Sequence, residues 1–172
     1  MTRRLQPDDN IVLIGMPGVG KSTAGVLLAK ATGREFIDTD VAMQVRCGRR
    51  LQEIIDADGL DVFRRIEQAR ILELDCRRHV IATGGSVVYS AAAMAHLKAG
   101  GPVVHLDLPL ERIIERIDNL DVRGVVMEPG CTLADLHRQR QPLYQRYADL
   151  TVQCDGLTQD QVVAEIIRKL GC

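Results

Sequence analysis

Short apolar runs alternate along this chain with longer stretches of helical periodicity. Ile11–Ile14 and the later runs "EFID", "HVIAT", "PVVHLDL" and "LTVQC" are rich in β-branched residues, and each is followed by a candidate helix. Continuous apolar strands separated by helices are typical of a parallel sheet, because helices cover both of its faces and leave no polar side. The pattern predicts an α/β fold.

The last helix is predicted together with its two ends. Thr158 and Gln161 have the spacing of a capping box, which marks a helix start. Lys169 followed by Gly171 is a typical helix end.

Residues 60–78, "LDVFRRIEQARILELDCRR", predict another helix and the face that it buries. Its apolar stripe at helical spacing consists of Val62, Ile66, Ala69, Leu72 and Cys76. Such a stripe is expected to face the core, with the charged side in water.

Residues 119–132, "NLDVRGVVMEPGCT", interrupt the regular pattern. They hold two glycines, a proline and isolated charges between two helical stretches. A loop of about a dozen residues inside a compact domain is more often functional than idle. We expect a mobile lid here, within a single domain that spans residues 1–172.

A phosphate-binding motif follows the first apolar run. Residues 15–22 fit G-x-x-x-x-G-K-[ST], in which a glycine-rich backbone turns its N–H groups toward an anion at the start of a helix. Lys21 is expected to reach the β- and γ-phosphates, and Ser22 to offer an oxygen to Mg²⁺. The other predicted nucleotide contacts in this segment are Gly15, Gly18, Val19, Gly20 and Thr23. The motif predicts that the chain binds a nucleoside triphosphate.

Composition and charge argue against two classes of partner. The net charge is −1, aromatic residues make up 3% and tryptophan is absent, so neither a basic field nor stacking platforms favour nucleic acid. The apolar runs are far shorter than the ~20 residues of a membrane span, and the first ten residues lack the apolar core of a signal peptide. We expect a cytoplasmic monomer with neither nucleic-acid nor membrane partners.

Four further motifs follow the phosphate loop in a specific order. They are "FIDTD" at 36–40, "FRRIE" at 63–67, "TGGS" at 83–86 and "RQPLY" at 140–144. In this order, over nearly the whole chain, they resemble the shikimate kinase family. The resemblance implies a P-loop NTPase fold like that of nucleoside monophosphate kinases. It also implies ATP-dependent phosphorylation of the 3-hydroxyl of shikimate, a small carboxylate-bearing alcohol.

The resemblance also implies roles for individual residues at the acceptor end. Asp38 would help to hold the water shell of Mg²⁺, and Asp40 would contact the hydroxyl that is phosphorylated. Arg64 and Arg140 would bind the acceptor carboxylate, with a helical segment at about 38–66 forming much of the substrate site. The backbone of the turn would approach substrate and γ-phosphate at Gly84 and Gly85.

Two more arginines match the family at the nucleotide end. Arg123 corresponds to the lid arginine, and Arg116 to the residue that lies against adenine. Phosphoryl transfer has a loose transition state, so catalysis consists mainly of alignment and charge neutralisation. Lys21, Mg²⁺ and a closing Arg123 would surround the phosphates with positive charge, and Asp40 would position the acceptor hydroxyl.

The sequence departs from the family pattern at two places. Ser86 stands where the family usually has a third glycine, and "RGVV" at 123–126 replaces R-P-L-L. A serine could crowd the substrate ring or supply a new hydrogen bond. Gly124 in place of proline raises the entropy lost when the lid closes.

These departures leave alternatives open. One is a related kinase of another carboxylate-bearing alcohol, such as homoserine. Another is a regulatory module that binds nucleotide without transfer, and a third is a nucleoside or nucleic-acid kinase. At the level of single residues, an aspartate of "FIDTD" could instead be a helix N-cap, and Arg64 could pair with neighbouring acids on a solvated helix face.

Overall fold

The computed structural model describes residues 5–118 and 125–171, and within them a parallel five-stranded sheet has the order β2-β3-β1-β4-β5. All four neighbouring strand pairs are parallel. The strands are β1 (Ile11–Ile14), β2 (Glu35–Asp38), β3 (His79–Ala82), β4 (Val103–Asp107) and β5 (Leu150–Gln153). The α/β prediction is confirmed, and each predicted strand is present.

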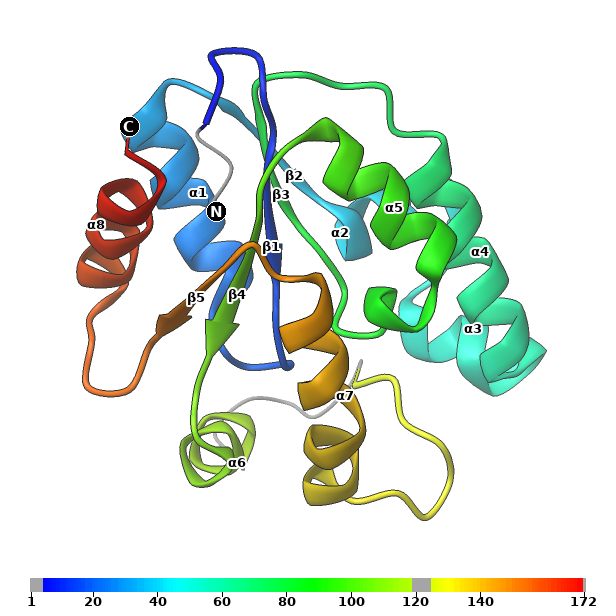
Figure 1. Ribbon diagram of the computed structural model, residues 1–172. Helices are drawn as coiled ribbons and strands as arrows, with labels where there is room; N and C mark the ends of the chain where they lie inside the picture. Colours follow the sequence, from blue (N-terminus) through cyan, green and yellow to red (C-terminus); the bar gives the residue numbers. More distant parts are fainter. Residues whose placement is uncertain (1–4, 119–124, 172) are drawn as a thin grey trace.

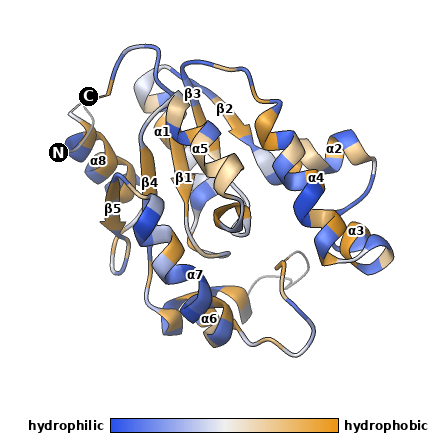
Figure 2. Cartoon of the chain, turned by 45° about the vertical axis from the view of Figure 1, so that its right-hand side comes forward, coloured by the Kyte–Doolittle hydropathy of each residue, from blue (hydrophilic) through white to orange (hydrophobic). Residues whose placement is uncertain are grey.

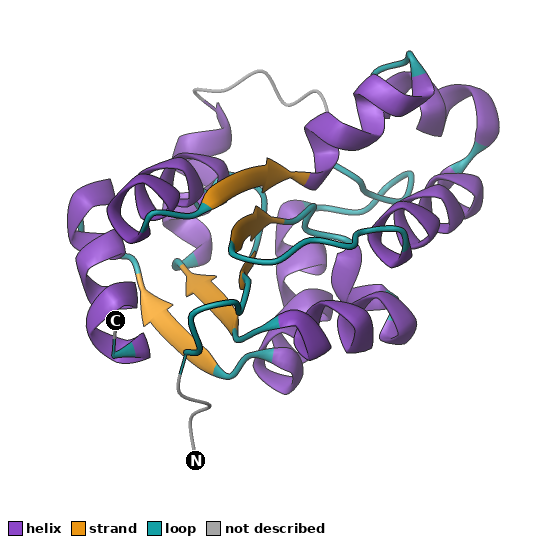
Figure 3. Cartoon of the chain, turned by 90° about the horizontal axis from the view of Figure 1, so that it is seen from above, coloured by secondary structure: helices purple, strands orange, loops and turns teal. Residues whose placement is uncertain are grey.

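Helices cover both faces of this sheet (Figures 1 and 3). Helices α1 and α8 pack together on one side, whereas α5 and α7 lie on the other. The helices are α1 (Lys21–Thr32), α2 (Thr39–Cys47), α3 (Leu51–Asp58), α4 (Leu60–Leu72), α5 (Ala91–Gly100), α6 (Leu110–Asp118), α7 (Leu133–Tyr147) and α8 (Gln159–Leu170), with a 3₁₀ turn η1 (Val87–Tyr89).

The core consists of a large cluster around the sheet and a smaller one among α2, α3 and α4. In Figure 2 the strands are mostly hydrophobic, in keeping with their burial on both faces. The smaller cluster contains Met43, Leu51, Ile54, Phe63 and Val126. Through Val126, this cluster connects the helical segment at 38–66 to residues 125–132, the part of the predicted lid that the structure describes.

The predicted ends of the last helix are confirmed. Thr158 accepts a hydrogen bond from the backbone N–H of Gln161, and the Gln161 side chain accepts one from the backbone N–H of Thr158. Gly171 ends the helix in a left-handed conformation.

The buried face predicted for residues 60–78 is wrong. Helix α4 ends at Leu72, and it buries Phe63, Glu67 and Ile71 while Ala69 and Leu72 are exposed. The reason is that α4 packs mainly against the helices α2, α3 and α5, and its inner face includes the carboxylate of Glu67. The sequence-based prediction considered only apolar residues as buried, so it placed Glu67 on the solvent side.

None of the helices in the described part of the chain combines the length and apolar character that a membrane span requires.

Candidate active site

The candidate site lies where the parallel strands end. Strand β1 leads into the phosphate loop, β2 ends at Asp38, and β3 leads into the turn at Gly84. Because the carboxyl ends of parallel strands share one edge of the sheet, these segments meet there, next to the central strand β1 where the connections change direction. A small cavity of about 60 Å³ at this edge is lined by Pro17, Lys21, Asp40, Gly84, Gly85, Ser86, Val126 and Arg140. The structure thus brings five of the predicted site residues together.

The phosphate loop has the backbone shape that its glycines allow. Gly20 has φ +99°, a backbone conformation that is strained for any residue with a side chain. The buried Lys21 follows it at the start of α1, and its Nζ donates to the carbonyl oxygens of Gly15 (2.8 Å) and Met16 (2.9 Å). Burial lowers the pKa of Lys21 to about 8, and the nearby Asp40 carboxylate opposes that shift.

The first turn of α1 presents two hydroxyl groups. Ser22 and Thr23 are both exposed, whereas Val19 of the loop packs into the main core. Ser22 Oγ donates to Oδ2 of Asp38 at 2.5 Å. The hydroxyl and the carboxylate therefore meet at the mouth of the loop.

Asp38 is also the N-cap of α2. Its Oδ1 accepts from the backbone N–H groups of Asp40 (3.0 Å) and Val41 (3.1 Å). The helix-cap alternative is thus correct for Asp38, yet it occupies only one of the two carboxylate oxygens. The other oxygen is the one that meets Ser22.

The oxygen atoms at this point suit Mg²⁺. Among residues 5–118 and 125–171, no cluster of three or more histidine, cysteine or acidic side chains could hold a metal alone. Mg²⁺, however, usually keeps several waters and takes only one or two protein oxygens besides phosphate. Ser22 Oγ and Asp38 Oδ2 are such a pair, so the donor set fits the ion.

Two carboxylates flank the turn after β3. A Cβ on Gly84 would lie 2.6 Å from Oδ1 of Asp40 and 2.8 Å from Oε1 of Glu67, so the bare backbone is what lets both acids approach. Burial, together with the charge of Asp38, raises the pKa of Asp40 to about 6. Burial likewise raises the pKa of Glu67 to about 7.

The two predicted carboxylate-binding arginines differ in exposure. Arg140 is 1% exposed, and its Nη2 donates to the carbonyl of Val126 at 2.8 Å. Arg64 has a 33% exposed side chain, with its guanidinium 3.6 Å from Oε1 of Glu128 and 4.0 Å from Oδ1 of Asp61. The expected pairing of Arg64 with nearby acids therefore occurs, and Arg64 is not among the residues that line the cavity.

The remaining two predicted arginines, Arg116 and Arg123, were expected at the nucleotide end. Arg116, on α6, donates through Nη1 to the carbonyls of Val19 (3.1 Å) and Gly18 (3.4 Å), so it lies against the phosphate loop. Its contact with adenine stays a prediction. Arg123 and Gly124 lie outside the described residues.

Comparison with known proteins decides the family. Residues 17–171 match the family model for shikimate kinase. The chain belongs to the shikimate kinase family. A shikimate kinase of Pseudomonas aeruginosa (strain LESB58) is 40% identical over 165 residues, which cover 94% of this chain and 95% of the relative. One from Thiobacillus denitrificans is 38% identical, covering 94% and 88% of the two chains.

Solved shikimate kinases have the same architecture. The enzyme of Acinetobacter baumannii, in complex with shikimate, superimposes with a TM-score of 0.87 at 31% identity, covering 94% of this chain and 92% of that one. The enzyme of Aquifex aeolicus gives 0.77 at 30% identity, with 94% and 96% covered. The predicted P-loop kinase fold is confirmed.

Ser86, one of the two departures from the family pattern, has a defined place. Its Oγ lies 2.8 Å from each carboxylate oxygen of Glu67, and the residue is 2% exposed. Of the two consequences expected for a serine here, the structure shows the hydrogen bond. The hydroxyl is directed at Glu67 on α4, while the residue also lines the cavity.

Sequence reasoning overlooked two residues that support the site of this shikimate kinase family member. Glu67 ends "FRRIE", and the spacing Phe63–Glu67–Ile71 was a usable sign that the acid faces inward. Tyr144 ends "RQPLY", and its hydroxyl donates to the carbonyl of Gly85 at 2.9 Å. It thereby holds the turn that lines the cavity.

Tyr144 is supported in turn by His105 on β4. The two rings stack with centroids 5.0 Å apart and an interplanar angle of 22°. Burial lowers the pKa of His105 to about 4, so the imidazole is neutral at physiological pH. No local sequence signal connects these two residues, because they are far apart along the chain.

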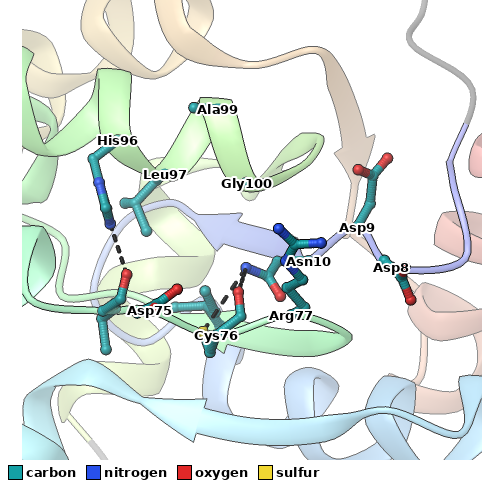
Figure 4. A pocket seen from close by; sticks show the side chains of 12 residues that line it. Asp8, Asp9, Asn10, Asp75, Cys76, Arg77, His96, Leu97, Ala99 and Gly100 are labelled. Carbon is teal, nitrogen blue, oxygen red and sulfur yellow. Dashed lines mark hydrogen bonds between the residues drawn. The ribbon is translucent and has the colours of Figure 1, made fainter.

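A larger pocket of about 340 Å³ lies at the opposite, amino ends of the strands (Figure 4). Its polar groups serve the loops themselves: Asn10 Nδ2 donates to the carbonyl of Cys76 (2.8 Å), and His96 Nε2 lies 2.8 Å from that of Leu74. No described residue that the family motifs single out lines this pocket.

Proposed function

We propose that this chain transfers the γ-phosphoryl group of ATP to the 3-hydroxyl of shikimate. The observation that carries the proposal is that Lys21, Asp40 and Arg140 line one small cavity. Lys21 supplies a cation for the phosphates, and Asp40 supplies a carboxylate for the acceptor hydroxyl. Arg140 supplies a buried cation for the acceptor carboxylate. The A. baumannii relative, solved with shikimate, has the same overall fold.

The nucleotide end is formed by backbone and Lys21. The N–H groups of the loop and the positive end of α1 bind the phosphates. Lys21 exchanges its two carbonyl partners for phosphate oxygens, which restores the charge that burial disfavours. Ser22 and Asp38 would hold Mg²⁺, which neutralises charge on the β- and γ-phosphates. Contacts of Gly15, Gly18, Val19, Gly20 and Thr23 with ATP, of Arg116 with adenine and of Arg123 with the phosphates belong to the same proposal.

The acceptor end aims one hydroxyl at the γ-phosphorus. Arg140 and Arg64 bind the carboxylate, while the turn at Gly84 and Gly85 contacts the ring through its backbone. Asp40, ionised above pH of about 6, accepts a hydrogen bond from the 3-hydroxyl. This alignment lowers the barrier because the reacting atoms are already oriented.

The transfer step exchanges one bond for another. The acceptor oxygen bonds to the γ-phosphorus as the bond from that phosphorus to the β,γ-bridging oxygen breaks, and ADP leaves. The hydroxyl proton passes to Asp40 and then to water. Because the transition state is loose, Asp40 acts mainly by positioning the hydroxyl.

The acceptor is expected to be selected steeply. A site built to hydrogen-bond a particular hydroxyl can reject an analogue without it by about 10⁴. The hydroxyl of Ser86, at the edge of the cavity, is bonded to Glu67. The family and the relative solved with shikimate favour shikimate over homoserine as the acceptor. Cytoplasmic location and monomeric assembly stay predictions from composition.

A panel of acceptors tests the proposal. Purified protein with MgATP is offered shikimate, homoserine and no acceptor, with ADP measured by a coupled assay and the product by ³¹P NMR. We expect a shikimate 3-phosphate signal and ADP release with shikimate only. Turnover of homoserine alone would establish the alternative kinase, and ATP binding without transfer to any acceptor would establish the regulatory module.

Two lysine variants of the same helix sharpen the assay. Lys21→Ala should lower kcat by at least about 10³, because the transition-state charge loses its buried cation. Lys30→Ala, at the exposed end of α1, is the matched control and should behave like the parent. Equal activity of both variants would remove Lys21 from the site.

A further inference from the structure

Tyr89 is shared by the two arginines assigned to the acceptor carboxylate. Its ring centroid lies 5.0 Å from Cζ of Arg64 and 5.3 Å from Cζ of Arg140. The arginines come from α4 and α7, and Tyr89 ends η1, which packs against both helices. One aromatic ring thus connects guanidinium groups from two separate elements.

The ring compensates an unfavourable arrangement of charge. Two guanidinium groups that bind one carboxylate must stand near each other before that carboxylate arrives, and Arg140 is almost fully buried. It donates hydrogen bonds to two neutral oxygens, the Val126 carbonyl and the Tyr89 hydroxyl. Its charge also acts on Asp40 and the buried Glu67, whose carboxyl pKa values are nevertheless raised by burial. The negative face of an aromatic ring attracts cations within about 6 Å of its centroid, more strongly where water is excluded.

Arg64 depends on the ring for its orientation. Its two ion-pair partners, Glu128 at 3.6 Å and Asp61 at 4.0 Å, are themselves well exposed, so these pairs constrain the guanidinium weakly. The charge of Arg64 also acts on the buried Glu67. Its Nε is buried without a hydrogen-bond partner. A planar guanidinium stacks well on an aromatic face, which sets the direction of its fork.

The hydroxyl of Tyr89 contributes less than the ring. Its contacts with Nε of Arg140 and Oε1 of Gln139 are both 3.4 Å, near the limit for a hydrogen bond. The two ring contacts lie well inside the cation–π range. Removing the hydroxyl alone should therefore have little effect.

We propose that Tyr89 is a positioning residue for the acceptor carboxylate: its ring holds the guanidinium groups of Arg64 and Arg140 ready to bind one carboxylate together. This inference rests on the proposed function, because it assigns both arginines to the acceptor. Tyr89 follows directly after the turn that lines the cavity, so the same segment contacts the ring of the acceptor and organises its carboxylate site.

Steady-state kinetics of ring variants test the role. Tyr89→Leu should raise the KM for shikimate about 10-fold, equivalent to about 1.4 kcal/mol, while kcat and the KM for ATP stay within about two-fold of the parent. Tyr89→Phe should have nearly the parent KM, because it keeps the ring. Circular dichroism checks the fold, and Tyr89→Met replaces Tyr89→Leu if that variant does not fold.

A matched control comes from the other end of α7. Arg146 lies over the ring of Tyr147 at 5.6 Å, and neither residue lines the cavity. Tyr147→Leu removes the same kind of cation–π contact from Arg146, an arginine that is not assigned to the acceptor. It should leave the KM for shikimate unchanged.

The carboxamide analogue of shikimate separates positioning from a general structural role. It lacks the charge that the two guanidinium groups recognise, so Tyr89→Leu should lower kcat/KM for shikimate about 10-fold and leave kcat/KM for the carboxamide unchanged. Equal losses with both acceptors, or an unchanged KM in Tyr89→Leu, would overturn the inference while the parent's activity upholds the proposed function. A parent without activity on shikimate would overturn the proposed function, and this inference with it.

Discussion

Asp40 and Glu67 both approach the bare backbone of Gly84, and Asp40 also interacts with the ammonium group of Lys21. Burial raises the pKa of the two carboxyl groups, to about 6 and about 7, and lowers that of Lys21 to about 8. Such shifts arise because a buried site disfavours every charged form. The charge of the cavity therefore changes within a narrow range around neutral pH.

We expect a bell-shaped pH dependence of kcat/KM for the acceptor. Asp40 accepts a hydrogen bond only when ionised, so activity falls as pH drops through about 6. Lys21 loses its charge above about pH 8, so activity falls again there. Asp40→Asn should lower kcat and abolish the acid limb, whereas Glu67→Gln should keep that limb. An acid limb that persists in Asp40→Asn would contradict the role of Asp40.

At the scale of elements, a buried hydrogen bond to a carboxylate connects α4 to the turn after β3. Glu67 on α4 accepts the hydrogen bond of Ser86, which opposes the effect of burial on the Glu67 pKa. The raised pKa shows that burial outweighs this bond and the nearby arginines. Because the folded state disfavours the ionised form, the burial of Glu67 costs stability at neutral pH.

Glu67→Gln should raise stability in a pH-dependent way. A carboxyl pKa raised from 4.5 to about 7 stabilises the fold below about pH 4.5, and this contribution is lost as pH rises through 7. The variant should therefore exceed the parent in free energy of unfolding at pH 8 by on the order of 2 kcal/mol, and match it near pH 4.5. Urea unfolding at the two pH values measures the difference.

An exposed glutamate provides the control for that experiment. The hydrogen bond from Arg168 lowers the pKa of Glu165, so its ionised form is favoured and Glu165→Gln should show no gain at pH 8. A gain of equal size for Glu67→Gln at both pH values would mean that shape, rather than ionisation, explains it.

At the scale of the whole molecule, the described part of the predicted lid, residues 125–132, contacts both arginines that we propose bind the acceptor. Val126 packs with α2, α3 and α4 and offers its carbonyl to Arg140. Glu128 pairs with Arg64 at 3.6 Å, with a side chain that is 65% exposed. An incoming carboxylate must therefore compete with Glu128 for Arg64.

Glu128→Gln should lower the KM for shikimate by about two-fold. The gain is small because an exposed ion pair is worth roughly 0.2–1 kcal/mol, and kcat should not change. Glu73→Gln, which removes a surface partner of Arg46 and Arg70, is the control. A higher KM in Glu128→Gln, or the same decrease in both variants, would contradict the competition.

Features that depend on residues near one another in the sequence were predicted correctly. Several contacts between residues that packing brings together were not. Strand order along the chain, the caps of α8, the phosphate loop and the family were predicted from the sequence alone. The buried face of α4 was predicted wrongly, because Glu67 was counted as polar. Tyr89 lies outside every motif, so no pattern indicated its contact with two arginines.

The sequence by itself determined the elements, the phosphate loop and the family, since capping, backbone turns and apolar runs depend on residues close together along the chain. Only the tertiary structure decided which side chains share the cavity, how far burial moves their pKa values and which ring orients the arginines. The physical reason is that desolvation and cation–π contact depend on distances between elements, and helix packing sets those distances.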